Sequence, residues 1–157
     1  MRPDLVEKIQ VMVVLVALLP LSGAVLNGLL GRRFPKGLVT AIGCGMPLLA
    51  FVAGAIAHVN LLKIYHPVDR SVGIPLFEWL RADLAGAALE VRLGFLLDPL
   101  SSVLVLVVTG VGFLIHVYST GYMAKDPGYR RYFAFLNLFL FCMLVLVLAD
   151  SLPLLFA

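Results

Sequence analysis

Charged side chains are scarce in this sequence of 157 residues, of which Asp, Glu, Lys and Arg make up 13%. Ordinary soluble domains carry about twice that share. Four stretches contain no such residue at all: 9–31, 37–62, 99–124 and 132–149. At about 1.5 Å of helix per residue, each can span a hydrocarbon core about 30 Å thick when its polar ends lie at the interface. This pattern excludes a soluble enzyme, a nucleic-acid-binding domain, a collagenous chain and a disordered tail, and it predicts a membrane protein.

Cysteine is also scarce, and the two that are present, Cys44 and Cys142, lie in separate apolar stretches. They form no CxxC pair, so the sequence predicts neither a disulfide framework nor a metal or iron–sulfur site. We expect both to be small packing residues. His58, His66 and Asp69 have no metal-ligand spacing, and we expect them to be unliganded loop residues. The net charge of +3 is divided among short loops, which argues against a nucleic-acid partner.

The four charge-free stretches are apolar on all sides, which predicts helices and not the alternating strands of a membrane barrel. We therefore expect an all-α polytopic membrane protein with four transmembrane helices and a small extracytoplasmic β-hairpin between helices two and three. The expected division is 1–62 for two N-terminal helices, 63–98 for the extracytoplasmic loop, and 99–157 for helices three and four. A signal peptide at 1–30 is the alternative for the first helix, but its apolar run exceeds the usual ~7–15 residues.

Two kinds of signal place the helix starts. The first helix is expected near Ile9 and the fourth near Tyr132, where the charge-free stretches begin, with the fourth reaching Asp150. The third helix has the clearest start, because Asp98 places an N-capping carboxylate directly before Pro99 at the first helical position. Asp98 could instead serve as a proton-entry carboxylate at the outer surface, but capping accounts for it fully, so we assign it as a helix cap.

The connection between the second and third helices carries a strand pattern. Residues 89–95 alternate apolar and other side chains with period two, as a half-buried strand does. Residues 74–80 are the expected partner strand, with a turn at 83–86. The alternative is an irregular loop with a short interfacial helix at 79–84.

Basic residues set the expected orientation. Arg32, Arg33 and Lys36 lie in one short connection, and Lys125 and Arg130–Arg131 lie in another, on the same side if all four helices span. By the positive-inside rule this is the cytoplasmic side, which places the N-terminus and the hairpin outside. We expect a multi-pass protein of the inner (plasma) membrane of a bacterium.

A set of motifs in fixed order extends along the second half of the chain. They are LGFLLDP at 93–99, TGVG at 109–112, IHVYSTGYM at 115–123, GYRRYFAFLNLF at 128–139 and LAD at 148–150. This series resembles the N-terminal part of subunit L (chain 5 in mitochondria) of respiratory complex I, the proton-translocating NADH-quinone oxidoreductase. The resemblance is dense over 94–156 and looser elsewhere. Related multisubunit cation/proton antiporters share part of the pattern and are the alternative, as is a non-catalytic structural fragment.

The resemblance implies an antiporter-like subunit several times longer than this chain, which ends just before the helix that would carry the family's glutamate. We therefore expect a fragment or a truncated product with no catalytic residue of its own. The resemblance also implies partners, namely the other membrane subunits of complex I and the lipid bilayer. NADH, FMN, iron–sulfur clusters and quinone are implied for the parent complex, and none is expected to bind this chain.

Two polar residues inside the apolar stretches are candidates for function. His116 is an ionisable group expected about 25 Å along the third helix from Pro99, near the inner interface. It could relay protons, since an ordinary histidine exchanges near neutral pH, or it could be a structural residue bonded to Tyr118, Ser119 or a neighbouring helix. Asn137 lies among phenylalanines and is expected to make an interhelical hydrogen bond.

Overall fold

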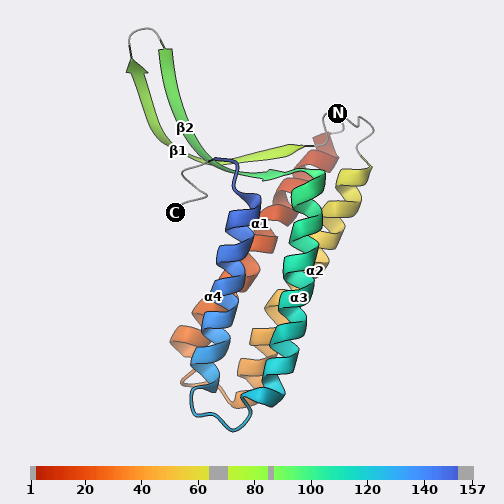
Figure 1. Ribbon diagram of the computed structural model, residues 1–157, viewed down its shortest axis with the longest axis vertical. Coiled ribbons are helices and arrows are strands. Elements are labelled where there is room, and N and C mark those ends of the chain that lie inside the picture. The colour runs from red at the N-terminus through yellow and green to blue at the C-terminus, as the bar shows by residue number, and fades with distance from the viewer. Residues whose placement is uncertain (1–2, 64–70, 85–86, 152–157) are drawn as a thin grey trace.

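A computed structural model describes residues 3–63, 71–84 and 87–151 as a bundle of four helices with a β-hairpin at one end (Figure 1). The elements in chain order are α1 (Pro3–Val25), η1 (Leu26–Leu30), α2 (Lys36–Leu62), β1 (Val72–Leu84), β2 (Ala87–Leu97), α3 (Pro99–Tyr122) and α4 (Tyr129–Leu148). Four helical segments, one of them α1 continued by η1, are long and apolar enough to cross a membrane. The predicted fold class is confirmed.

The predicted starts of the first and fourth helices are too late. α1 begins at Pro3 and α4 at Tyr129, so each includes charged residues that the charge-free stretches leave out. Proline suits the first position of a helix, and Asp4 in the first turn of α1 interacts favourably with the helix dipole. The charge-free stretch marks the part of a helix that suits hydrocarbon, and the helix itself extends further.

The other end of α4 also differs from the expectation. α4 ends at Leu148, two residues before the predicted limit, because the chain there joins the hairpin. The Asp150 main-chain N–H donates to the carbonyl of Gly94 at 3.0 Å, and Ala149 forms a β-bridge with Phe95. This pairing fixes the exit of α4 against β2.

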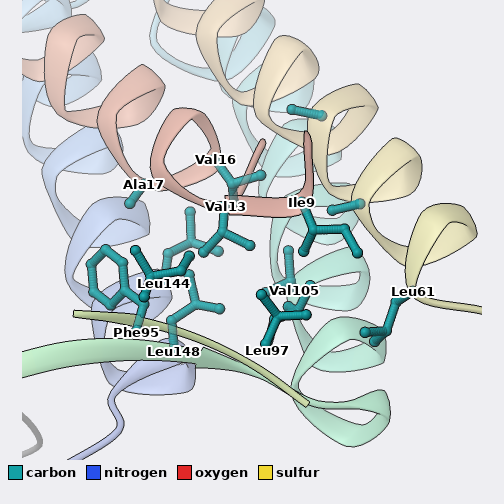
Figure 2. Close-up of a cluster of buried hydrophobic side chains, with 14 of the residues drawn as sticks. Ile9, Val13, Val16, Ala17, Leu61, Phe95, Leu97, Val105, Leu144 and Leu148 are labelled. Atoms are coloured by element: carbon teal, nitrogen blue, oxygen red, sulfur yellow. The ribbon is translucent and has the colours of Figure 1, made fainter. Parts of the chain in front are cut away.

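The helices pack in a closed arrangement around a common interior. α1 packs against α2 and α4, and α3 packs against α2 and α4. The main core cluster lies at the hairpin end, where side chains from all four helices and from β2 converge (Figure 2). Its fully buried members include Ile9, Val13, Leu61, Leu144 and Leu97. β2 therefore closes the end of the bundle with its own apolar side chains.

The hairpin is longer than predicted but has the predicted partners and direction. β1 and β2 pair antiparallel from Val72 opposite Leu97 to Leu84 opposite Ala87. At the base, Val72 and Ile74 are buried and Gly73 between them is exposed, which is the expected period-two alternation. The predicted turn at 83–86 begins too early, since β1 continues to Leu84; positions 85 and 86 lie outside the described residues. The alternative helix at 79–84 is excluded, because these residues belong to β1.

The two basic connections meet at the end of the bundle opposite the hairpin (Figure 1). The Lys36 ammonium donates to the Ala124 carbonyl at 3.3 Å, and the Arg130 guanidinium donates to the Gly31 carbonyl at 3.2 Å. The expectation that both connections share one side is confirmed. That this side faces the cytoplasm, with the N-terminus outside, stays a prediction.

Candidate functional site

Asp98 occupies the junction between β2 and α3. Its carboxylate Oδ1 accepts from the Ser101 main-chain N–H, and the Ser101 hydroxyl Oγ lies 2.8 Å from the Asp98 main-chain nitrogen and accepts in return. This reciprocal pair is a capping box, with Pro99 at the first helical position. Hydrogen bonds from the Ser101 main chain and side chain lower the pKa of Asp98, because they stabilise its charged form. The geometry is that of a cap.

A buried polar cluster lies toward the other end of the bundle. We define it by three residues from three segments, Asn27 of η1, His116 of α3 and Asn137 of α4, each with no more than 2% of its surface exposed. Each has one buried side-chain atom with no hydrogen-bond partner among the described residues: Asn27 Oδ1, His116 Nε2 and Asn137 Oδ1. Buried polar atoms are usually paired with protein or water, so these three mark places where water or a further polar group fits.

His116 makes its hydrogen bond within its own helix. The ring Nδ1 lies 2.7 Å from the Gly112 carbonyl, and a carbonyl only accepts, so Nδ1 carries the hydrogen. In the neutral ring Nε2 then holds a lone pair, and this atom is the one without a partner. Two of the partners expected from the sequence, Tyr118 and Ser119, are wrong: Tyr118 is 74% exposed, and Ser119 bonds the Ile115 carbonyl and the Tyr132 hydroxyl instead. A buried acceptor of this kind can receive a proton or hold a water molecule.

Asn137 joins three helices. Its Nδ2 donates to the Gly43 carbonyl of α2 at 3.2 Å and to the Phe133 carbonyl of its own helix at 2.9 Å. Its Oδ1 faces α1, since a Cβ placed on Gly23 would stand 2.8 Å from that oxygen. The interhelical contact that sequence analysis assigned to Asn137 is present in this geometry.

Asn27 is a cluster member that sequence analysis did not single out. It lies in η1, a π-helical turn, and its Nδ2 donates to the Val39 carbonyl of α2 at 3.3 Å. Short π-helical segments inside longer helices often occur at functional sites. The available signal was an asparagine inside an apolar stretch, the same signal that singled out Asn137.

His58 was expected in a loop, and that expectation is wrong. It lies in α2, and its ring Nδ1 is 3.0 Å from the Ser102 hydroxyl of α3. His66 and Asp69 lie outside the described residues. Within 3–63, 71–84 and 87–151, no group of three or more His, Cys, Asp or Glu could hold a metal ion. Two cysteines, Cys44 on α2 and Cys142 on α4, are too few for a four-thiolate cluster.

The spans and their buried polar groups define a polytopic helical membrane protein. A family model described as "NADH-Ubiquinone oxidoreductase (complex I), chain 5 N-terminus" matches residues 84–133. This stretch holds the second strand, Asp98 and His116, and it ends before Asn137.

Relatives extend the match over most of the chain. The chain is 42% identical over 142 residues to NADH-quinone oxidoreductase subunit L of Mycobacterium tuberculosis, a match that covers 90% of this chain and 22% of that protein. Subunit L of Escherichia coli (strain K12) is 37% identical over 147 residues, which cover 92% and 22% of the two chains. NADH-ubiquinone oxidoreductase chain 5 of Metridium senile is 35% identical over 150 residues, or 92% and 23%.

By sequence, the chain is similar to the N-terminal region of subunit L and chain 5 of complex I. It spans 22% of the length of its bacterial relatives named above. With four membrane-spanning helices and bacterial subunit L homologues, it is a multi-pass protein of an inner membrane.

Proposed function

We propose that this chain is the N-terminal segment of the antiporter-like, proton-translocating membrane subunit of NADH-quinone oxidoreductase, which couples NADH oxidation and quinone reduction to proton pumping. The observation that carries the proposal is the identity of 42% over 90% of the chain to a subunit L. The four apolar spans support it, because a proton-translocating subunit must cross the membrane. Other membrane subunits of the complex and the lipid bilayer are the partners.

In this proposal the redox chemistry belongs to other subunits. NADH, FMN, iron–sulfur clusters and quinone supply the electron transfer of the parent complex, and this chain offers no thiolate set to hold a cluster. The chain contributes helices whose exposed apolar faces meet lipid or further helices. Examples of these exposed side chains are Leu100, Leu114, Phe135 and Phe139.

His116 is the proton-relay candidate within this function. Its Nε2 lone pair is buried and has no partner among the described residues, so a water molecule or a titratable group of another segment can bond to it. The alternative is a structural histidine whose bond to the Gly112 carbonyl is its whole role. We expect its effect on proton transfer to be modest.

Affinity purification of the full-length protein from its host membrane tests the proposal. We expect it to copurify with flavin- and iron–sulfur-containing subunits, and we expect NADH oxidation to acidify the lumen of inverted membrane vesicles. A multisubunit cation/proton antiporter would instead give sodium-dependent proton movement without NADH and no redox subunits. That result would replace the proposal with its alternative.

A further inference from the structure

A second polar feature lies at the end of the bundle where the two basic connections meet. It shares only Asn27 with the buried cluster. A surface cavity of about 500 Å³ is lined by Asn27, Gly28 and Leu29 of η1, by Arg32, and by Arg130 and Arg131 of α4. The first and last of these residues are about a hundred positions apart in the sequence. The pairing of the two basic connections brings their guanidinium groups around one hollow.

The charge around this cavity is of one sign. Residues 31–36 contain no acid, and the connection from Met123 to Gly128 contains one, Asp126. The Asp126 Oδ1 accepts from the Gly128 main-chain N–H, so that carboxylate is engaged in its own turn. Three guanidinium groups with no free carboxylate in the adjoining connections favour the binding of an anion, and the geometry of their planar N–H groups matches phosphate oxygens.

The position of Arg130 is fixed by the fold. One guanidinium nitrogen donates to the Gly31 carbonyl, directly after the π-helical turn. A guanidinium has five N–H donors, so this bond leaves most of its donor capacity for a ligand. The cavity wall is therefore held in place by a bond between α4 and the end of η1.

The cavity wall also has a polar and an apolar member. Asn27 lines the cavity but is only 2% exposed, and its buried Oδ1, which has no partner among the described residues, suits an ordered water. Leu29 lines the same cavity and is 77% exposed. An exposed leucine adds nothing to the binding of a free phosphate ion. A lipid carries an apolar chain next to its phosphate, and the leucine can contact that chain.

We propose that this cavity binds the phosphodiester head group of an anionic phospholipid, with Arg32, Arg130 and Arg131 as its ligands. Basic pockets between membrane helices are known to take such head groups, and the site lies where the apolar spans end. The proposal does not depend on the redox or proton chemistry of the parent protein.

The test is lipid retention by the full-length protein, purified in detergent with whatever subunits accompany it. Native mass spectrometry counts bound phosphatidylglycerol after exchange, with zwitterionic phosphatidylcholine as the comparison lipid. The site variant is Arg32→Gln/Arg131→Gln, which leaves the Arg130 bond in place. The matched control is Arg33→Gln/Lys125→Gln, which removes the same charge from the same two connections outside the cavity lining.

We expect tight phosphatidylglycerol binding in the unmodified protein and in the control. Binding should weaken about fivefold for each arginine removed, and so about 25-fold in the site variant, from the usual contribution of one basic residue near anionic lipid. Equal losses of phosphatidylglycerol binding in the site variant and in the control would show that binding depends only on general surface charge, and would overturn the proposal. So would equal binding of phosphatidylcholine, displacement of the lipid by millimolar inorganic phosphate, or a subunit bound over the cavity with no lipid retained.

Discussion

Phe133 of α4 lies directly against Gly43 of α2. A Cβ built on Gly43 would stand 2.5 Å from the Cδ1 atom of the ring, closer than real Cβ atoms approach any neighbour. The same glycine accepts a hydrogen bond from Asn137, one turn further along α4. The His116 ring lies 6.2 Å from the Phe133 ring, centroid to centroid. The absence of a side chain at one position of α2 therefore sets how closely α4 approaches α2.

Substitution of Gly43 is expected to destabilise the packing of α2 against α4. Gly43→Ala should cost about 1–3 kcal/mol, since the added methyl group overpacks a buried contact. Gly45→Ala is the matched control on the same helix, where nothing lies within 4 Å of the added Cβ. The measurement is thermal unfolding of the detergent-purified protein. Equal unfolding midpoints for Gly43→Ala and Gly45→Ala would contradict this prediction, because they would show that α4 can move away from α2 at no cost.

The cap at Asp98 predicts a specific order of variants. Asp98→Asn should be mild, because asparagine caps nearly as well, whereas Asp98→Ala should cost about 1 kcal/mol. If Asp98→Asn abolished proton pumping in the full-length parent while assembly stayed normal, the carboxylate would be functional and the cap assignment incomplete.

The lowered pKa of Asp98 adds a pH dependence. A carboxyl whose pKa is lower in the folded state stabilises the fold above its ordinary value of 3.8, and this contribution disappears as the pH falls through the folded-state pKa. The stability difference between the unmodified protein and Asp98→Ala should therefore shrink below about pH 4. Unfolding midpoints of the two proteins between pH 7 and pH 3 provide the check, and a difference that stays constant would contradict it.

The fold followed from the sequence where one physical signal sufficed. Charge-free length gave the four spans, and the Asp98-Pro99 pair gave the start of α3 to the residue. The starts of α1 and α4 could not be predicted to the residue, because charged residues such as Arg130 can continue a helix into the interface. The end of α4 depends on the Asp150 bond to Gly94, a contact between positions far apart in the sequence.

The site was predictable only in part, for a related reason. An intramembrane histidine and an asparagine among phenylalanines attract attention by their polarity alone. Their partners are main-chain carbonyls, of Gly112 for His116 and of Gly43 for Asn137. Every residue has such a carbonyl, so no sequence pattern marks which one is used. The arginine-lined cavity likewise depends on two connections that meet only in the folded bundle.

Orientation is tested by thiol labelling in a background without Cys44 and Cys142. Cysteines introduced at Asp83 and Asp126 lie in the hairpin and in a basic connection. The positive-inside rule predicts that a membrane-impermeant reagent labels position 83 in intact cells and position 126 only after permeabilisation. The reverse pattern would place the basic connections outside and invert the topology.

His116→Ala is expected to lower proton translocation only modestly in the assembled parent. The reason is that the described contacts of the ring are a bond to the Gly112 carbonyl and packing near Phe133, both of which a structural histidine would make. His116→Gln, which keeps a hydrogen-bond donor, is the comparison variant. Proton uptake by reconstituted vesicles, with assembly checked in parallel, gives the readout. Loss of most translocation in both variants, with assembly intact, would establish His116 as a relay.

The 157 residues by themselves are expected to conduct no protons. The apolar parts of the four spans, 9–31, 37–62, 99–124 and 132–149, contain no Asp, Glu, Lys or Arg that could carry a proton. A proton path across about 30 Å of hydrocarbon requires titratable groups or ordered water held by polar side chains. The buried cluster defined above lies toward one end of the bundle. At the other end, the hydrogen-bonded pair of His58 and Ser102 borders an interior that the apolar core in Figure 2 fills.

Reconstitution of this chain in liposomes with a pH-sensitive dye tests the expectation. Under an imposed proton gradient, its leak should equal that of an unrelated four-helix membrane protein at the same density. The core cluster at the hairpin end includes Val13, Val105 and Leu144, whose apolar side chains cannot hold a chain of ordered water molecules. A saturable leak above the control, abolished by His116→Ala, would show that the buried cluster suffices for conduction and that the apolar half admits water.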